Sequence, residues 1–208
     1  MGKRKRNIFF TSDWHIGHQN ILKFCDRKCD NLDQMHKKLI NGYNTMVRPE
    51  DVCYFIGDMG LCSSGVMLGI IEKLNGTKVL FLGNHDKGSD TMGGLGFDCV
   101  LTSGELIIAQ ERVTISHCPL RKTFREDTTG MNNVKDGEGW HGETRHDRFS
   151  LDNRGQFHIH GHIHSPNSGR SKRIEGRQID VGVDANDYKP VSISQIESFI
   201  VRVKREEE

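Results

Sequence analysis

Short apolar runs alternate with amphipathic segments over the first 85 residues of the chain. The runs are rich in β-branched and aromatic residues, which is typical of buried strands. The strands predicted in this way span residues 7–12, 52–56 and 77–82. Between them, residues 32–47 and 64–74 place apolar side chains near helical spacing, with Asn31 and either Ser63 or Ser64 as N-caps. Alternation of this kind predicts an α/β fold with parallel strands.

The pattern changes after residue 85. Three apolar runs with little sequence between them predict strands of a second sheet at residues 97–101, 105–109 and 112–116. Further strands are predicted at residues 156–160, 178–183 and 198–203. Residues 121–155 are polar, glycine-rich and without periodicity, which predicts a long insert. No internal repeat or domain boundary is visible, so we expect a single domain over residues 1–208.

Composition and charge argue against several classes of protein. A chain of 208 residues can bury a sizeable core. The 29 basic and 28 acidic residues nearly cancel, so no global field points to nucleic acid. No apolar stretch approaches the ~18 residues of a spanning helix, and no secretory signal is expected. The six cysteines lack the paired spacing of a zinc site. We therefore expect reduced thiols, a cytoplasmic location and no membrane partner.

Five short clusters of metal-binding residue types recur along the chain. They are Asp13-Trp14-His15, Gly57-Asp58, Gly83-Asn84-His85-Asp86, Ser116-His117 and Gly161-His162-Ile163-His164. Each cluster follows an apolar run, and the carboxyl ends of strands are where open α/β sheets bind ligands. A single Asp-x-His or Asn-His would be an ordinary surface pair or turn, but five such clusters after successive strands predict one shared site.

The residue types favour a pair of divalent cations. Carboxylate oxygen, amide oxygen and imidazole nitrogen suit hard and borderline ions. Seven candidates exceed one four-coordinate site and predict two ions that share a carboxylate; the candidates are Asp13, His15, Asp58, Asn84, His117, His162 and His164. Asp58, in the middle of the set, is the expected bridge. Two ions about 3.5–4 Å apart can clamp a phosphate and activate a bridging water.

His85 and Asp86 have separate predicted roles. His85 adjoins a ligand without being needed as one, so it is the candidate general acid or charge stabiliser. Asp86 is expected to orient the His85 imidazole.

With these motifs in order, the chain resembles the calcineurin-like metallophosphoesterase superfamily, whose pattern is D-x-H, G-D, G-N-H-D/E, a histidine after a strand, and G-H-x-H. The likeness extends through Lys189-Pro190-Val191-Ser192 and so covers nearly the whole chain, although residues 121–155 exceed what a minimal member needs. The opening FTSDWHIGHQNILKFC is similar to a small bacterial and phage branch. The resemblance implies a four-layer α/β/β/α sandwich of two mixed sheets flanked by helices.

The resemblance also implies an assignment of ligands. One ion would take Asp13, His15, Asp58 and His164, and the other would take Asp58, Asn84, His117 and His162. Family members use manganese, iron, zinc or related ions; we expect manganese, with iron, zinc or nickel as alternatives. The implied activity is hydrolysis of a phosphate mono- or diester, with Asp58 and His85 as catalytic residues.

Nucleotides or nucleic-acid ends are the favoured substrates, and no obligate protein partner is expected. His18 and Asn20 lie in the loop beside the metals and are candidates for binding substrate phosphate. Arg121, near the insert, is a third candidate. Trp140 could stack a base or anchor the insert. The basic residues Arg170, Lys172, Arg173 and Arg177 form either a solvated loop or a rim that steers phosphorylated substrates.

Two other functions are less favoured. His15-Ile16-Gly17-His18 spells the phosphate-binding signature of class I nucleotidyltransferases, but the chain lacks the accompanying lysine motif. A non-catalytic protein-binding scaffold of the same fold remains the alternative; such relatives usually lose ligands, whereas this chain keeps all seven. His158 and His160 alternate along a predicted strand and are expected to be packed or surface histidines rather than further ligands.

Overall fold

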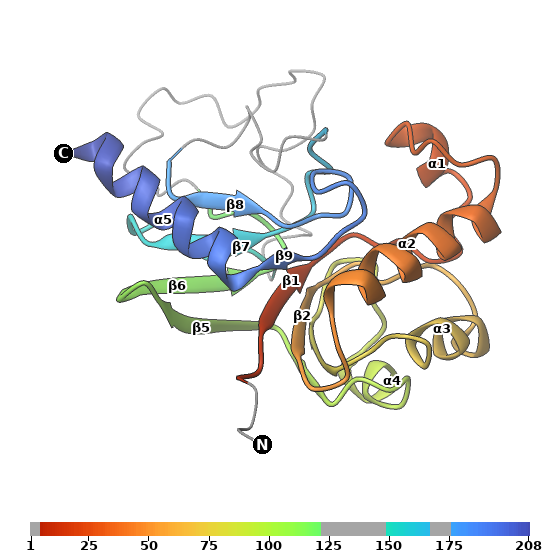
Figure 1. Ribbon diagram of the computed structural model, residues 1–208. Helices are drawn as coiled ribbons and strands as arrows, with labels where there is room; N and C mark the ends of the chain where they lie inside the picture. Colours follow the sequence, from red (N-terminus) through yellow and green to blue (C-terminus); the bar gives the residue numbers. More distant parts are fainter. Residues whose placement is uncertain (1–4, 122–148, 167–175) are drawn as a thin grey trace.

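The computed structural model describes residues 5–121, 149–166 and 176–208 and shows an α/β fold with two mixed sheets (Figure 1). Most of the predicted insert at 121–155 lies outside the described residues. Trp140, Arg170, Lys172 and Arg173 lie outside them as well.

The first sheet has five strands in the order β4-β3-β2-β1-β9. Strands β1 to β4 run parallel, and β9 pairs antiparallel with β1. The strands are β1 (Ile8–Thr11), β2 (Val52–Ile56), β3 (Thr77–Phe81), β4 (Cys99–Leu101) and β9 (Val191–Ser192). Because β1, β2 and β3 are parallel neighbours, their carboxyl ends meet at one edge of the sheet.

The second sheet has four strands in the order β5-β6-β7-β8. β5 pairs antiparallel with β6, and β6, β7 and β8 run parallel. The strands are β5 (Ser103–Ile108), β6 (Glu111–Ser116), β7 (Phe157–His160) and β8 (Gln178–Asp180). The five helices of the described residues are α1 (Ile21–Phe24), α2 (Leu32–Met46), α3 (Ser64–Ile71), α4 (Ser89–Gly93) and α5 (Ile193–Glu207).

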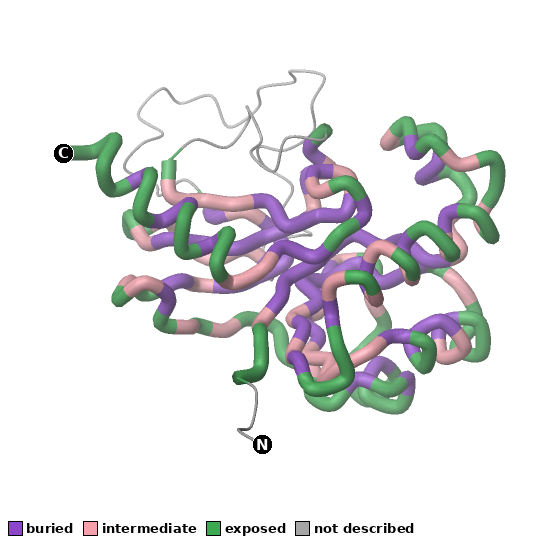
Figure 2. The backbone as a smooth tube through the Cα atoms, in the orientation of Figure 1, coloured by how far each residue is buried: buried purple, intermediate pink, exposed green. Residues whose placement is uncertain are grey.

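Two apolar cores lie on opposite faces of the first sheet. Successive side chains of β1 point to opposite faces of the sheet. Phe9 therefore lies in the core shared with α2 and α3, and Phe10 lies in the core shared with the second sheet and α5. In Figure 1, helices α1 to α4 lie on one side of the first sheet, with the second sheet and α5 on the other. Figure 2 shows the buried backbone concentrated along the strands between these layers.

Most predicted elements are confirmed, and two predictions are wrong. Asn31 caps α2 by accepting from the Gln34 amide, and Ser63 caps α3 by accepting from the Val66 amide. Residues 198–203 are not a strand, because they lie inside α5. The run at 97–101 contributes β4 to the first sheet, parallel to β3, and not to the second. Among the described residues, no helix combines the length and apolar character needed to cross a bilayer.

Candidate metal centre

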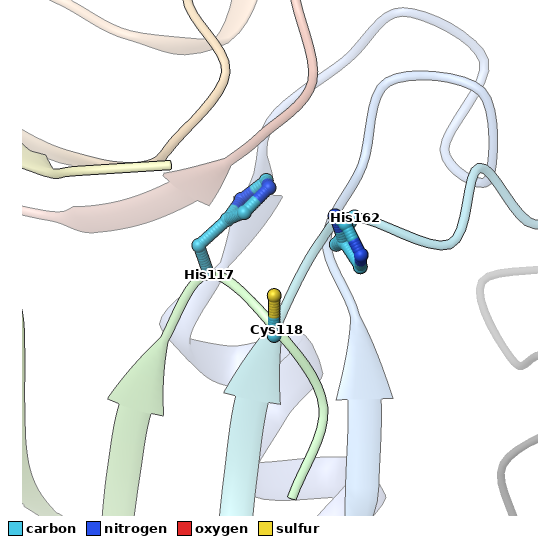
Figure 3. A group of neighbouring side chains, drawn as sticks. All are labelled: His117, Cys118 and His162. Atoms are coloured by element: carbon cyan, nitrogen blue, oxygen red, sulfur yellow. The ribbon is translucent and has the colours of Figure 1, made fainter. Parts of the chain in front are cut away.

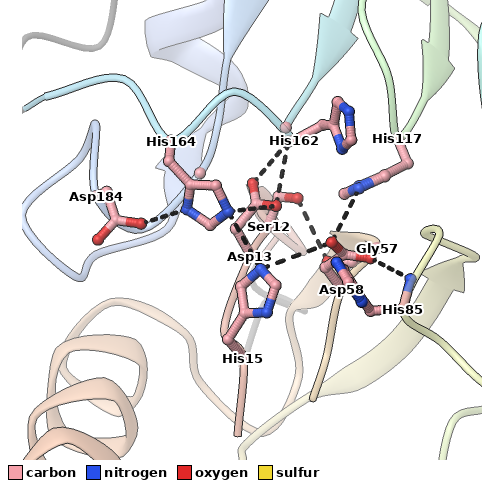
Figure 4. Close-up of polar contacts among 12 residues, drawn as sticks. Ser12, Asp13, His15, Gly57, Asp58, His85, His117, His162, His164 and Asp184 are labelled. Atoms are coloured by element: carbon pink, nitrogen blue, oxygen red, sulfur yellow. Dashed lines mark hydrogen bonds and ion pairs between the residues drawn. The ribbon is translucent and has the colours of Figure 1, made fainter. Parts of the chain in front are cut away.

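The backbone at the predicted ligands is in an unusual conformation. Five of the seven have positive φ, a region that non-glycine residues rarely occupy. The angles are 60° at Asp13, 50° at His15, 56° at Asp58, 70° at His162 and 46° at His164. Such conformations persist only where the surrounding structure enforces them, and they gather at functional sites. Figure 4 shows that the side chains of Asp13, His15, Asp58 and His164 meet around a common centre, whereas the His162 ring lies beside His117.

Main-chain hydrogen bonds hold these turns together. The Asp13 amide donates to the Gly57 carbonyl at 3.1 Å, and the His15 amide donates to the Asp58 carbonyl at 3.0 Å. The His162 amide donates to the Asp13 carboxylate at 2.9 Å, which joins the second sheet to the first. The ends of β1, β2 and β7 thus form one connected unit.

Asp13, His15 and His164 form the first group of donors. The two Nε2 atoms of His15 and His164 lie 3.2 Å apart, and His164 Nε2 is 3.9 Å from Asp13 Oδ1. Their ligand atoms all lie within 4.8 Å of one another. His164 Nδ1 is bonded to Asp184 Oδ2 at 2.8 Å, which orients the ring so that Nε2 faces the group (Figure 4).

Asp58 and His117 form the second group together with Asn84 and His162. His117 Nε2 lies 3.3 Å from Asp58 Oδ2 and 3.1 Å from Asn84 Oδ1. His117 Nδ1 is bonded to the Ile56 carbonyl at 2.7 Å, so Nε2 faces the donors. The His162 ring centroid lies 5.0 Å from that of His117. Asp58 Oδ2 is also 3.6 Å from His15 Nε2, so one oxygen lies between the two groups.

Burial and neighbouring charges shift the pKa values of the aspartates and histidines in the cluster. Burial raises the pKa of Asp13 to about 6, although neighbouring His164 and His117 lower it. Burial also opposes ionisation of Asp58, but His117 and His15 hold the pKa of that carboxyl far below its usual range. Burial lowers the pKa of His15 to about 2, so its imidazole is neutral and can act as a ligand.

His85 differs from the ligands because its side chain is exposed. Its amide donates to Asp58 Oδ1 at 2.9 Å, and its ring centroid lies 5.5 Å from that of His15. The predicted role of Asp86 is wrong. Its carboxylate accepts from the Asp58 and Gly83 amides at 2.9 Å and 2.8 Å, so it fixes the main chain of Asp58 rather than the His85 ring.

Sequence reasoning missed Arg27, which is 4% exposed. Its guanidinium donates to both Asp184 oxygens, at 2.8 Å and 2.9 Å. It also donates to the Asp13 carbonyl at 2.6 Å, to the Trp14 carbonyl at 2.9 Å and to Met35 Sδ at 3.4 Å. These five contacts match the five N–H groups of an arginine. Asp184, for which the sequence predicted no role, links this arginine to His164.

The predicted substrate-binding residues lie at different distances from the cluster. The His18 ring centroid is 5.5 Å from that of His15, which places His18 at the rim. Asn20 is exposed at the start of α1. Arg121 is in an exposed ion pair with Asp152 at 2.8 Å. Substrate binding by these residues stays a prediction.

The interpretation of His158 and His160 as packed histidines is confirmed. Both are buried, with exposed fractions of 1% and 0%. His158 contacts the Thr114 hydroxyl and the Cys118 carbonyl, which accounts for both of its ring nitrogens.

Known proteins similar to this chain come from archaea, phages and bacteria. No family model matches. The chain is 30% identical over 203 residues to the Uncharacterized protein MJ1445 of Methanocaldococcus jannaschii, covering 96% of this chain and 94% of that protein. It is 32% identical over 212 residues to the Gene 66 protein of Mycobacterium phage L5, covering 97% of each. The crystal structure of AQ665, a protein of unknown function from Aquifex aeolicus, matches with a TM-score of 0.65 at 24% identity. That match covers 94% of this chain and 100% of AQ665, and it shows a shared fold.

Proposed function

Because the chain belongs to the family of the archaeal protein MJ1445 and the mycobacteriophage Gene 66 proteins, whose names state no activity, we propose its function from the site itself. The chain is a dinuclear metal-dependent phosphoesterase of the calcineurin-like superfamily. It hydrolyses phosphate mono- or diesters, with nucleotides or nucleic-acid ends as the favoured substrates. As its fold we propose the four-layer α/β/β/α sandwich of that superfamily. Helices α2 and α3 pack on one face of the first sheet, and α5 packs into the core that the two sheets share.

The position of Asp58 carries this proposal. A single carboxylate oxygen lies 3.6 Å from His15 Nε2 and 3.3 Å from His117 Nε2, and these two imidazoles belong to different donor groups. A carboxylate between two sets of nitrogen and oxygen donors is the arrangement expected of a shared ligand. The aspartate has little freedom to move, because its own amide and its Oδ1 are both engaged in hydrogen bonds.

The donor set fits two divalent cations. Two of the histidines have Nδ1 fixed by an acceptor, Ile56 O for His117 and Asp184 for His164, which leaves Nε2 for coordination. The first position would be held by Asp13, His15, Asp58 and His164, and manganese is the proposed ion there. The second would be held by Asp58, Asn84, His117 and His162. When bound, the ions supply Lewis-acid stabilisation of the phosphate charge and lower the pKa of water.

The residues around the proposed metal ligands would protonate the leaving oxygen and orient the phosphate. His85 is exposed beside the cluster and can donate a proton to the leaving oxygen, or balance its developing charge. Its main chain is fixed by the bond to Asp58 Oδ1, so the imidazole starts from a defined position. His18 and Asn20, at the rim, orient the phosphate through hydrogen bonds.

Metal removal tests this function. The chain is stripped with a chelator, and hydrolysis of bis(p-nitrophenyl) phosphate and p-nitrophenyl phosphate is followed before and after manganese is restored. We expect activity only with metal, and we expect Asp58→Ala to bind fewer than two ions. Asp33→Ala, at an exposed position of α2, is the matched control and should keep both. Full turnover by the stripped chain would contradict the proposal.

A further inference from the structure

A cysteine lies beside the second donor group. Cys118 directly follows His117 at the end of β6 and is 2% exposed. Its Sγ and one ring nitrogen each of His117 and His162 all lie within 4.8 Å of one another. Figure 3 shows the sulfur pointing toward the space between the two imidazoles, which come from the ends of β6 and β7.

The main chain of Cys118 is fixed by three hydrogen bonds. Its amide donates to the Phe149 carbonyl at 3.1 Å. Its carbonyl accepts from the Ser116 hydroxyl and from His158 Nε2, each at 3.1 Å. The orientation of the thiol therefore depends on the rotation of one side-chain bond, and a small rotation changes the distance from Sγ to both imidazoles.

We propose that Cys118 is a thiolate ligand of the second metal position, in addition to Asp58, Asn84, His117 and His162. The proposal rests on the dinuclear function above. Zinc–sulfur and zinc–nitrogen bonds of about 2.3 Å and 2.0–2.1 Å place neighbouring sulfur and nitrogen ligands of one ion about 3.1–3.6 Å apart. Sγ and the two ring nitrogens already lie within 4.8 Å of one another, so they need to approach by at most about 2 Å. The thiol proton passes to solvent as the metal–sulfur bond forms, with no change of oxidation state.

A sulfur ligand changes which ion the second position selects. Thiolate is a soft donor that favours zinc, cobalt and iron, whereas manganese prefers oxygen ligands. The first donor group consists of carboxylate oxygens and imidazole nitrogens. The two positions therefore differ in chemistry, and manganese is expected to be the weaker competitor at the second one.

Cys25 provides a matched control. Its Sγ also lies near a histidine ligand, within 4.8 Å of donor atoms of His164 and Asp184. Both Asp184 oxygens accept from Arg27, however, and this group includes no residue of the second position. Replacement of Cys25 should leave the spectrum of the second position unchanged.

Cobalt is the spectroscopic probe. The metal-free chain is titrated with Co²⁺, the number of bound ions is measured, and the near-ultraviolet region is recorded for the thiolate-to-cobalt charge-transfer band. We expect the band to rise with one of two bound ions. Cys118→Ser should lose the band while Cys25→Ser keeps it. Cys118→Ser should also lower the zinc-over-manganese preference of one ion by at least about tenfold.

The outcomes separate this proposal from the proposed function. Two bound cobalt ions without the charge-transfer band, or a band that survives in Cys118→Ser, would overturn the sulfur ligand and leave the dinuclear centre intact. Fewer than two bound ions in the unmodified chain would overturn both. Circular dichroism of Cys118→Ser and Cys118→Ala checks that each variant folds, and loss of the band in both folded variants supports the ligand.

Discussion

At the scale of single residues, His85 allows the proposed chemistry to be tested apart from the proposed metal binding. Its ring is exposed, and its amide donates to Asp58, the proposed bridge. His85→Ala should therefore keep both ions. It should reduce kcat by at least tenfold, since a positioned proton donor contributes about 10²–10⁴. Metal content and steady-state kinetics check this, with Lys87→Ala at an exposed neighbouring position as the control. An unchanged kcat would remove His85 from the mechanism.

Gly161, which precedes the final pair of histidines, has no room for a larger side chain. A Cβ at this position would lie 2.6 Å from Ser12 Cβ and closer still to Asp13 Oδ2. Gly161→Ala should displace the Asp13 carboxylate, weaken metal binding and destabilise the fold by about 1–3 kcal/mol. Gly69→Ala is the control, because its Cβ meets nothing within 4 Å and alanine favours the α3 helix. Equal metal affinity in the two variants would contradict this account.

The convergence of the candidate ligands could be predicted from the sequence because each is a metal-binding residue type directly after an apolar strand. Arg27 and Asp184 could not, because their role depends on a contact between residues 157 apart. Arg27 follows no strand and belongs to no motif. A buried arginine is also not expected from composition, since arginine is mostly exposed. Only the fold places its guanidinium beside the Asp13 carbonyl.

At the scale of elements, the two failed predictions have different causes. Residues 198–203 contain β-branched and aromatic residues that favour strands, but they lie inside α5, which begins at Ile193. The signal was present: Ser192 and Gln195 form a capping box in which each side chain bonds the other's main chain. The misplaced strand β4 shows a different limit, because local sequence predicts a strand but not the sheet that it joins.

Arg27 joins the turn after β1 to the loop that contains Asp184. The guanidinium ties the turn after β1 to Asp184, which orients His164. Arg27→Met leaves the buried Asp184 carboxylate without its arginine and with His164 as its remaining partner, which should cost about 3–5 kcal/mol of stability. It should also weaken the ion at the first position more than the ion at the second. Urea unfolding and metal titration measure the two effects.

The control for this prediction is an exposed arginine in a similar ion pair. Arg112 bonds Glu105 on the second sheet, but its side chain is 75% exposed. Exposed pairs contribute about 0–1 kcal/mol, so Arg112→Met should leave both stability and metal binding nearly unchanged. If Arg27→Met were no more destabilised than Arg112→Met, the link between the two loops would not contribute as proposed.

At the scale of the whole molecule, the candidate centre lies where the two sheets meet. The first sheet supplies donors from the ends of β1, β2 and β3, and the second supplies them from the ends of β6 and β7. Metal bound there would connect both sheets, so folding stability and metal affinity should be linked by mass action. Stability measurements therefore need a chelator throughout if the protein's own contributions are to be separated from those of the ions.

Under those conditions, His158 makes the metal-free fold sensitive to acid. Burial, with neighbouring His160, lowers the pKa of His158 to about 3, whereas its unfolded value is near 6.5. The unfolded state thus binds more protons below pH 6.5. The free energy of unfolding should fall as pH drops from 6.5 toward 3, by up to about 1.4 kcal/mol per pH unit from this group.

His158→Gln isolates this contribution, because its amide can still donate to the Cys118 carbonyl. The variant should be less stable than the original chain at pH 7, and the difference between them should narrow steadily toward pH 4. Urea unfolding across that range measures it. Parallel stability curves would show that His158 is protonated equally in both states, which is incompatible with a neutral imidazole packed between Thr114 and Cys118 in the second sheet.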